Sequence, residues 1–287
     1  MSIKKKIEEK GIPLSDWNIS INYGIKTGYN DAFIIDETTK NTLVASDPKS
    51  AELIRPILRG KDIKRYTYDF AKLWIIFIPC GFTNENKKYG IEPEQWFKET
   101  YPSLYFYLIE TEETLSKNRN NKSKGLFRRD DKGDYWWELR SCKYLDDFNK
   151  QKIIYPCIMS KQSSFMLDTL GKYFTVAPGN IITGSNLDYL ISCLNSKIYY
   201  FALRKFYMGG GIEGELKTNR LLILPVITAN CMNPESYKKI VDSEKIIQTY
   251  IDSKKSLENA SEIIDLEIAK ALDLTTFEYE YISHYMF

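Results

Sequence analysis

The stretch from Lys152 to Phe206, KIIYPCIMSKQSSFMLDTLGKYFTVAPGNIITGSNLDYLISCLNSKIYYFALRKF, decides the fold class. Its first part has short runs rich in β-branched and aromatic residues at 152–158, 165–167, 173–176 and 180–183, which predict strands separated by turns. Residues 186–206 then have apolar side chains at helical spacing, and Ser185 or Asn186 is a suitable N-cap. Strands precede a helix without regular strand–helix alternation, and this order favours an α+β fold.

The flanking sequence extends the same mixture of strands and helices. Extended pieces are predicted at 17–21, 32–35, 73–78 and 221–224, with a helix from Pro48 through Ile57 that Asp47 caps, and another helix over 93–117. From Pro234 onward the chain is helical. We therefore expect a mixed, curved sheet of short strands with packed helices, followed by a C-terminal helical region. The predicted organisation is a lead-in (1–16), a main domain (17–233) and a helical tail (234–287).

Charge is distributed unevenly between these regions. Residues 234–287 carry 11 acidic and 6 basic side chains, or −5, whereas residues 1–233 carry 34 basic and 27 acidic ones, or +7. In the tail, Tyr250, Leu257, Ile264 and Ala271 repeat every seven residues. That spacing fits either one seam of a helix pair or a single amphipathic helix that covers the domain.

Composition excludes several classes of protein. The longest dense apolar run, Leu73–Ile78, is far shorter than the ~20 residues that cross a bilayer, and no signal peptide is visible. Five widely spaced cysteines without a C-x-x-C pair give neither a disulfide framework nor a zinc site, and the only histidine is His284. We expect a soluble, cytoplasmic protein with no membrane partner, no metal site and no catalytic triad.

The densest basic segment is Lys117–Asp134, KNRNNKSKGLFRRDDKGD, which has seven Lys or Arg against three Asp. A polar, basic stretch of this kind is either a solvated loop or a loop that contacts phosphates. Its carboxylates, Asp130, Asp131 and Asp134, also leave open an autonomous metal-dependent enzyme, although no pairing of them is evident from the sequence.

Five segments in a fixed order carry a family resemblance. They are GIKTGYNDAFIID (24–36), ILRGKDIKRY (57–66), WELRSC (137–142), KIIYP (152–156), and LNSK (194–197) with Leu224–Pro225 after it. Together they resemble the TaqI-like C-terminal specificity domain of Eco57I-like restriction-modification enzymes, over roughly Trp17–Val226.

The resemblance implies a function for the chain. Such a domain reads a short asymmetric DNA sequence for an N-terminal domain that methylates adenine N6 with S-adenosylmethionine, and single-chain members also carry a nuclease domain. This sequence lacks the methylation tetrapeptide, Asn/Asp-Pro-Pro-aromatic. We therefore expect a specificity module alone, either a fragment or a separate subunit. S-adenosylmethionine and Mg²⁺ would belong to the missing catalytic parts, and the partners would be double-stranded DNA and a methyltransferase, with or without a nuclease.

The residue types suited to DNA binding define the candidate contacts. Lys and Arg bind phosphates, whereas base edges are read by Arg, Lys, Asn, Gln, Ser or Thr on protruding loops. For base reading we predict Arg128 and Arg129, or Asn118 and Asn120. The predicted phosphate contacts are Lys61, Lys64, Arg65, Lys122 and Lys124; Lys26 and Thr27 suit either role, Arg119 belongs to the same basic loop, and Lys161 and Gln162 lie in a second candidate turn. For Arg59, Glu138 and Arg140, a structural ion pair competes with a DNA contact.

Two other functions remain open at this stage. The chain could assemble with separate methyltransferase subunits through its acidic tail, which a co-purifying catalytic chain would show. It could instead be a protein-interaction domain with a Tyr-rich surface, since it has 21 Tyr, and with no role in DNA binding. Salt-dependent binding of duplex DNA separates this last function from DNA recognition.

Overall fold

The computed structural model describes residues 2–117, 124–159, 161–208, 214–250 and 254–285. The helices are α1 (Ile3–Lys10), α2 (Asn30–Phe33), α3 (Glu37–Ser46), α4 (Phe82–Asn86), α5 (Pro93–Thr100), α6 (Pro102–Ser116), α7 (Gly125–Arg128), α8 (Leu187–Asn195), α9 (Lys197–Ala202), α10 (Thr218–Leu222), α11 (Pro234–Thr249), α12 (Lys254–Ala271) and α13 (Thr276–Ser283). The strands are β1 (Ile12–Pro13), β2 (Ile19–Tyr23), β3 (Ile34–Asp36), β4 (Ile54–Leu58), β5 (Leu73–Ile76), β6 (Lys152–Pro156), β7 (Met166–Asp168), β8 (Phe174–Thr175), β9 (Gly179–Gly184) and β10 (Pro225–Val226).

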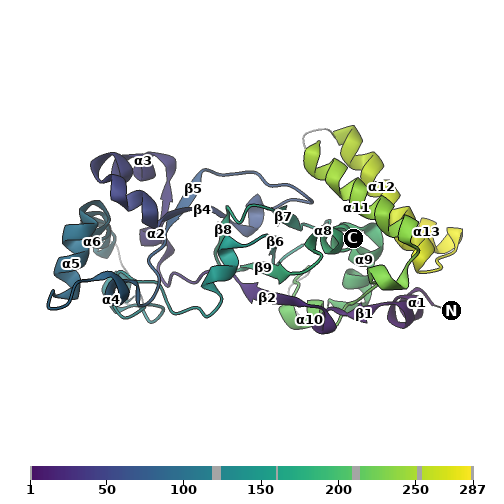
Figure 1. Cartoon of the computed structure of the whole chain (residues 1–287), viewed down its shortest axis with the longest axis horizontal. Coiled ribbons are helices and arrows are strands. Elements are labelled where there is room, and N and C mark those ends of the chain that lie inside the picture. Colours follow the sequence, from purple (N-terminus) through teal and green to yellow (C-terminus); the bar gives the residue numbers. More distant parts are fainter. Residues whose placement is uncertain (1, 118–123, 160, 209–213, 251–253, 286–287) are drawn as a thin grey trace.

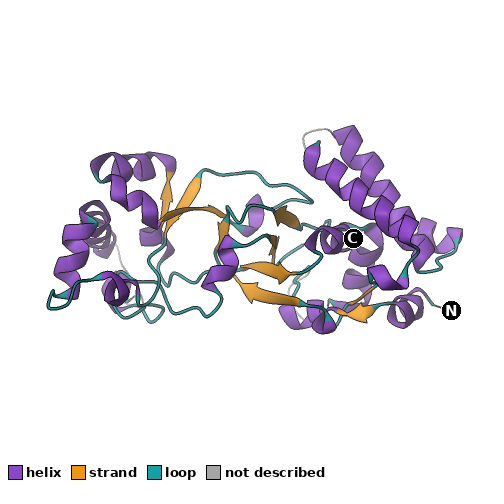
Figure 2. Ribbon diagram, viewed as in Figure 1, coloured by secondary structure: helices purple, strands orange, loops and turns teal. Residues whose placement is uncertain are grey.

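Strands occupy the middle of an elongated molecule, and helices gather at its two ends (Figures 1 and 2). One end carries α3 to α6, and the other carries α11 to α13. Two four-stranded sheets, ordered β2-β9-β6-β7 and β3-β5-β4-β8, and the short pair β1-β10 make up the sheet structure. This arrangement confirms the predicted α+β class.

The sheet β2-β9-β6-β7 separates two hydrophobic cores. Its neighbouring strands are antiparallel, with Ile153 opposite Ile182 and Ile154 opposite Ile181. Ile153 and Ile182 belong to one core and Ile154 and Ile181 to the other. Since successive side chains of a strand point to opposite faces, a strand between two cores is apolar at every position rather than at alternate ones. The continuous apolar run in KIIYP follows from this.

The second sheet and the helices α2 to α6 enclose one of these cores. Phe97 on α5 stacks on Trp137, with ring centroids 5.2 Å apart, and both side chains are buried. Strand β8 runs parallel to β4, whereas the other pairs of this sheet are antiparallel. This lobe also holds the described part of the basic segment 117–134.

The C-terminal tail packs onto the other core. Helices α11 and α12 lie side by side (Figure 1) and contact α8, while α13 contacts α9. Ile264 of the heptad positions is fully buried in the core that also contains Ile153, but Tyr250 is 57% exposed. The tail is therefore a helix pair that covers the domain, and the seven-residue repeat does not form one continuous buried seam.

Four local predictions are wrong, two of them because of prolines. Pro48–Leu53 is a 3-10 helix and Ile54–Leu58 is a strand, since Pro56 disfavours helical backbone at the residue before it. Pro102 likewise splits the helix expected over 93–117 into α5 and α6. Residues 221–222 end the helix α10 and 223–224 form no strand, while 32–33 belong to α2.

Among the helices of the described residues, none combines the length and the apolar character needed to span a bilayer.

Candidate nucleic-acid interface

A tight turn after β4 presents Lys61 to solvent. Arg59 and Asp62 hold this turn: Arg59 Nη2 lies 2.9 Å from Asp62 Oδ1, and Asp62 Oδ2 accepts hydrogen bonds from both the backbone N–H and Nε of Arg59. This ion pair raises the pKa of Arg59 through the hydrogen bond to Asp62. Lys64 is half-buried, donates from Nζ to the carbonyl oxygen of Lys61 at 2.9 Å and lies 3.6 Å from Asp69. Arg59 therefore forms the structural ion pair that was weighed against a DNA contact.

The two adjacent arginines of the basic segment have different environments. Arg128, the last residue of α7, is exposed, whereas Arg129 is only 4% exposed. The Arg129 guanidinium donates to five backbone carbonyl oxygens, those of Thr27, Leu126, Asp131, Trp136 and Glu138. The guanidinium carbon, Cζ, of Arg129 also lies 4.6 Å from the centroid of the Phe33 ring.

Arg129 is thus a cross-brace between three loops. Burial lowers the pKa of Arg129 to about 10, which still leaves the guanidinium charged at neutral pH. Because all five donors of a guanidinium point away from one carbon in a plane, one Arg can satisfy several carbonyl groups at once. All three nitrogens of the Arg129 guanidinium donate inside the protein, so of this pair Arg128 is the one with an exposed side chain.

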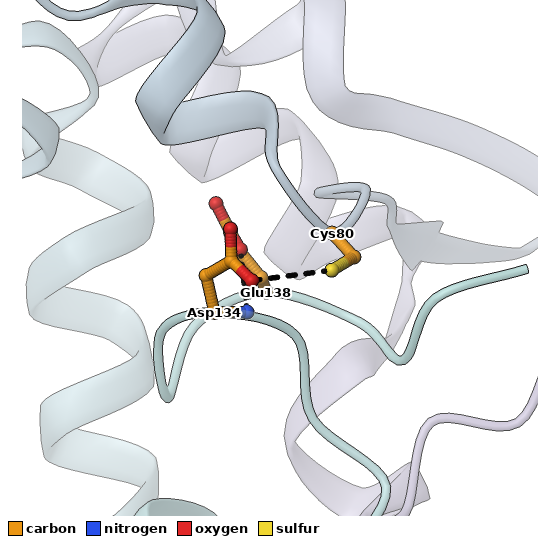
Figure 3. A group of neighbouring side chains, drawn as sticks. All are labelled: Cys80, Asp134 and Glu138. Carbon is orange, nitrogen blue, oxygen red and sulfur yellow. Dashed lines mark hydrogen bonds between the residues drawn. The ribbon is translucent and has the colours of Figure 1, made fainter.

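Glu138 organises a loop beside Cys80 and Asp134 (Figure 3). Its buried carboxylate accepts hydrogen bonds from the backbone N–H groups of Gly81, Thr83 and Asp134 at 2.9–3.1 Å. Cys80 Sγ lies 3.6 Å from Asp134 Oδ1, and the ligand-type atoms of Cys80, Asp134 and Glu138 are all within 4.8 Å of one another. The three backbone hydrogen bonds give the Glu138 carboxylate a structural role, although its partners are backbone N–H groups and not the cation of the expected ion pair.

The carboxylates of the basic segment are engaged with cations or amides. Asp130 pairs with Lys124 at 2.7 Å and Asp131 with Arg140 at 2.9 Å. Asp134 accepts from Asn84 Nδ2 at 3.0 Å. Arg140 therefore forms a structural ion pair, one of the two roles expected for it. Its side chain also lines a pocket of about 360 Å³ together with Lys26 and Lys143.

Lys26 and Thr27 are adjacent but differ in access. Lys26 is exposed at the rim of that pocket. Thr27 is 2% exposed, donates from Oγ1 to Asn30 Oδ1 at 2.6 Å and accepts the N–H of Tyr29, so its hydroxyl shapes the loop. Asn118, Arg119, Asn120 and Lys122 lie outside the described residues.

The fold brings together Arg65, Lys161 and Gln162, which are distant in sequence. They line one pocket of about 460 Å³ between the loop after β4, the turn before β7, the α8–α9 junction and α13. Lys197 lines the same pocket and is not among the predicted contacts, and the same holds for Lys143 in the other pocket. Lys197 belongs to the segment LNSK, so the segment that carried the resemblance was the available signal.

The chain matches one protein-family model, and its fold is similar to that of a solved enzyme structure. Residues 55–226 match the model of a family described as the TaqI-like C-terminal specificity domain. Among solved structures, the Type IIL restriction-modification enzyme MmeI in complex with DNA superimposes with a TM-score of 0.61 at 13% sequence identity, over 95% of this chain. The chain covers 36% of the length of that enzyme chain. No curated protein matches this sequence.

Proposed function

Because the chain belongs to the TaqI-like C-terminal specificity domain family, we propose that it is the DNA-recognition module of a restriction-modification enzyme. The match runs from β4 to β10 and includes β6, β7 and β9 of the central sheet, the described part of the basic segment and part of the lining of each pocket. The MmeI structure, determined with DNA, supports double-stranded DNA as the ligand. The family match is the observation that carries this proposal.

Exposed cations supply the two kinds of contact that such a module needs. Lys26, Lys61 and Lys124 are exposed on different loops, where they suit phosphate binding, and Arg128 is exposed beside α7, where it suits base reading. The buried Arg129 and Thr27 would position these loops rather than contact DNA. The predicted target-recognition domain, 17–233, encloses all of these residues.

The catalytic steps of the enzyme belong to other parts in this proposal. A methyltransferase domain or subunit, with or without a nuclease, would act on the site that this module selects. S-adenosylmethionine and Mg²⁺ would serve those parts. The chain itself would contribute affinity and sequence preference.

The test is selection of bound duplexes from a random DNA pool at two salt concentrations. One enriched asymmetric motif that survives the higher salt is the expected result. Enrichment of no motif together with salt-independent binding would contradict a DNA-recognition function and favour a protein partner.

Two variants refine the test. The double variant Lys61→Gln/Lys64→Gln should reduce the magnitude of the slope of log affinity against log salt by about two, because each lysine neutralises about one phosphate. Arg128→Gln should cost about 1–3 kcal/mol on the preferred site and relax the preference at one position. Lys238→Gln, an exposed lysine on α11, is the matched control and should change neither quantity.

A further inference from the structure

The pocket that contains Arg65 is cationic and is built partly by the C-terminal tail. Arg65 comes from the loop after β4, Lys161 from the turn before β7, and Lys197 from the start of α9. Ser283 and Tyr285, from the end of α13 and the residues after it, complete the wall. None of the described lining residues is acidic.

Arg65 is fixed in place yet retains hydrogen-bonding capacity. Its Nε donates to the carbonyl oxygen of Asn195 at 3.0 Å, and its guanidinium carbon lies 5.3 Å from the Tyr66 ring centroid. Its Nη2 is buried and has no hydrogen-bond partner among the described residues, and neither has Ser283 Oγ. Buried donors without a partner are rare in proteins, because each loses its hydrogen bonds to water.

The two lysines hold unpaired charges at the mouth of the pocket. Lys161 and Lys197 are exposed, and neither ammonium group forms an ion pair within the described part of the chain. An ammonium group that holds no carboxylate can bind an anion without first breaking another contact. The two lysines and Arg65 come from three segments, and the tertiary fold places all three on one cavity.

One buried carboxylate lies behind this cluster. Asp265 on α12 is fully buried, and its Oδ1 accepts the backbone N–H of Lys197 at 2.9 Å. Burial raises the pKa of Asp265 to about 6, against the opposing effect of Arg65. Even when Asp265 is ionised, three cations face one carboxylate, so the cluster keeps a net positive charge and favours an anion.

We propose that this pocket binds one phosphate group of the DNA backbone, with Lys197 and the end of α13 as part of the DNA-binding surface. The inference rests on the proposed function. A volume of about 460 Å³ is large enough for a phosphate with its adjoining sugar, since small-molecule pockets span roughly 300–1,000 Å³. The acidic tail would then bind DNA through this pocket while it covers the core.

Duplex binding by the full chain tests the proposal. Lys161→Gln and Lys197→Gln should each weaken binding several-fold on every DNA sequence, because a phosphate contact carries no sequence information. In the double variant the magnitude of the salt slope should fall by about one, since both lysines would neutralise the same phosphate. A wild-type slope would overturn the proposal, and so would a fall of about two, which would mean two separate phosphates on an open surface. In all three outcomes DNA recognition itself stands.

A second measurement decides the case in which the wild-type chain binds no duplex and the proposed function fails. The probe is inorganic phosphate against chloride at equal ionic strength, with the thermal unfolding midpoint as the readout. If phosphate raises the thermal unfolding midpoint of the wild type but not that of the double variant, the pocket binds free phosphate, and its assignment to DNA is overturned. No rise in either protein would refute an anion pocket altogether. Lys238→Gln should behave as wild type throughout.

Discussion

Replacing Arg129 by Gln should destabilise the protein severely without a specific effect on DNA reading. The change removes a buried cation that donates to the carbonyl oxygens of five residues, at 2.6 to 3.2 Å for the four hydrogen bonds other than that to Trp136. Gln is shorter and has only two donor hydrogens, so at least three of these carbonyl groups lose their bond to residue 129. Unpaired buried acceptors cost about 1–3 kcal/mol each, and relaxation and water entry recover part of the sum. We expect a net loss of about 3–5 kcal/mol, similar to breaking a buried ion pair.

Urea unfolding followed by tryptophan fluorescence measures this loss, since Trp136 and Trp137 lie beside the brace. With a dependence of about 3 kcal/mol per M of urea, the midpoint should fall by more than about 1 M. Arg128→Gln is the matched control, because Arg128 is exposed and makes none of these contacts. The urea midpoint of this variant should stay within about 0.2 M of the wild type. Equal midpoints for the two variants would refute the structural role of Arg129 and return it to the candidate base readers.

Two further predictions concern a buried acid and a glycine. Burial raises the pKa of Glu244 from its ordinary 4.5 to about 7, so between these values the folded chain holds a proton that the unfolded chain has lost, and stability falls as the pH rises. Glu244→Gln should therefore be more stable than the wild type by about 2–3 kcal/mol at pH 8 and nearly equal to it at pH 5. Urea unfolding of both proteins at the two pH values measures this, and the same difference in stability at both pH values would contradict it. Gly171 and Gly90 both have positive φ, but a Cβ on Gly171 would lie 2.1 Å from the carbonyl oxygen of Asn149, whereas Gly90 has open space. Gly90→Ala should cost about 1 kcal/mol and Gly171→Ala at least about 2 kcal/mol more in thermal or urea unfolding, and similar losses would refute the clash.

Some of the fold could be read directly from the sequence. KIIYP was predictable as a strand because of its β-branched and aromatic residues, and the structure places a core on each side of it. One predicted cap is present: Asp47 caps the turn that follows it, although that turn is a 3-10 helix and ends sooner than expected. Asn186 is the N-cap residue of α8, but its side chain makes no capping hydrogen bond. Where a proline interrupts a helical pattern, as at Pro56 and Pro102, the local rule against helical backbone before proline outweighs the apolar spacing.

The candidate site was less predictable, because the sequence treats neighbouring basic residues alike. Arg128 is the last residue of α7 and Arg129 follows it, and packing against Phe33 and five carbonyl groups places Arg129 inside. Lys143 and Lys197 were missed as pocket residues: nothing local distinguishes Lys143 from other exposed lysines, and for Lys197 the one signal was its place in the segment LNSK.

The sequence by itself determined the α+β class, the lack of cysteine or histidine motifs for catalysis, and the ordered segments that resemble a specificity domain. Only the tertiary structure decided which cations face solvent and which of them share a cavity. Arg65, Lys161 and Lys197 come from three distant segments, yet they line one pocket. The physical reason is that strand and helix preferences arise from neighbouring residues, whereas burial and the meeting of distant side chains follow from long-range packing that local patterns do not encode.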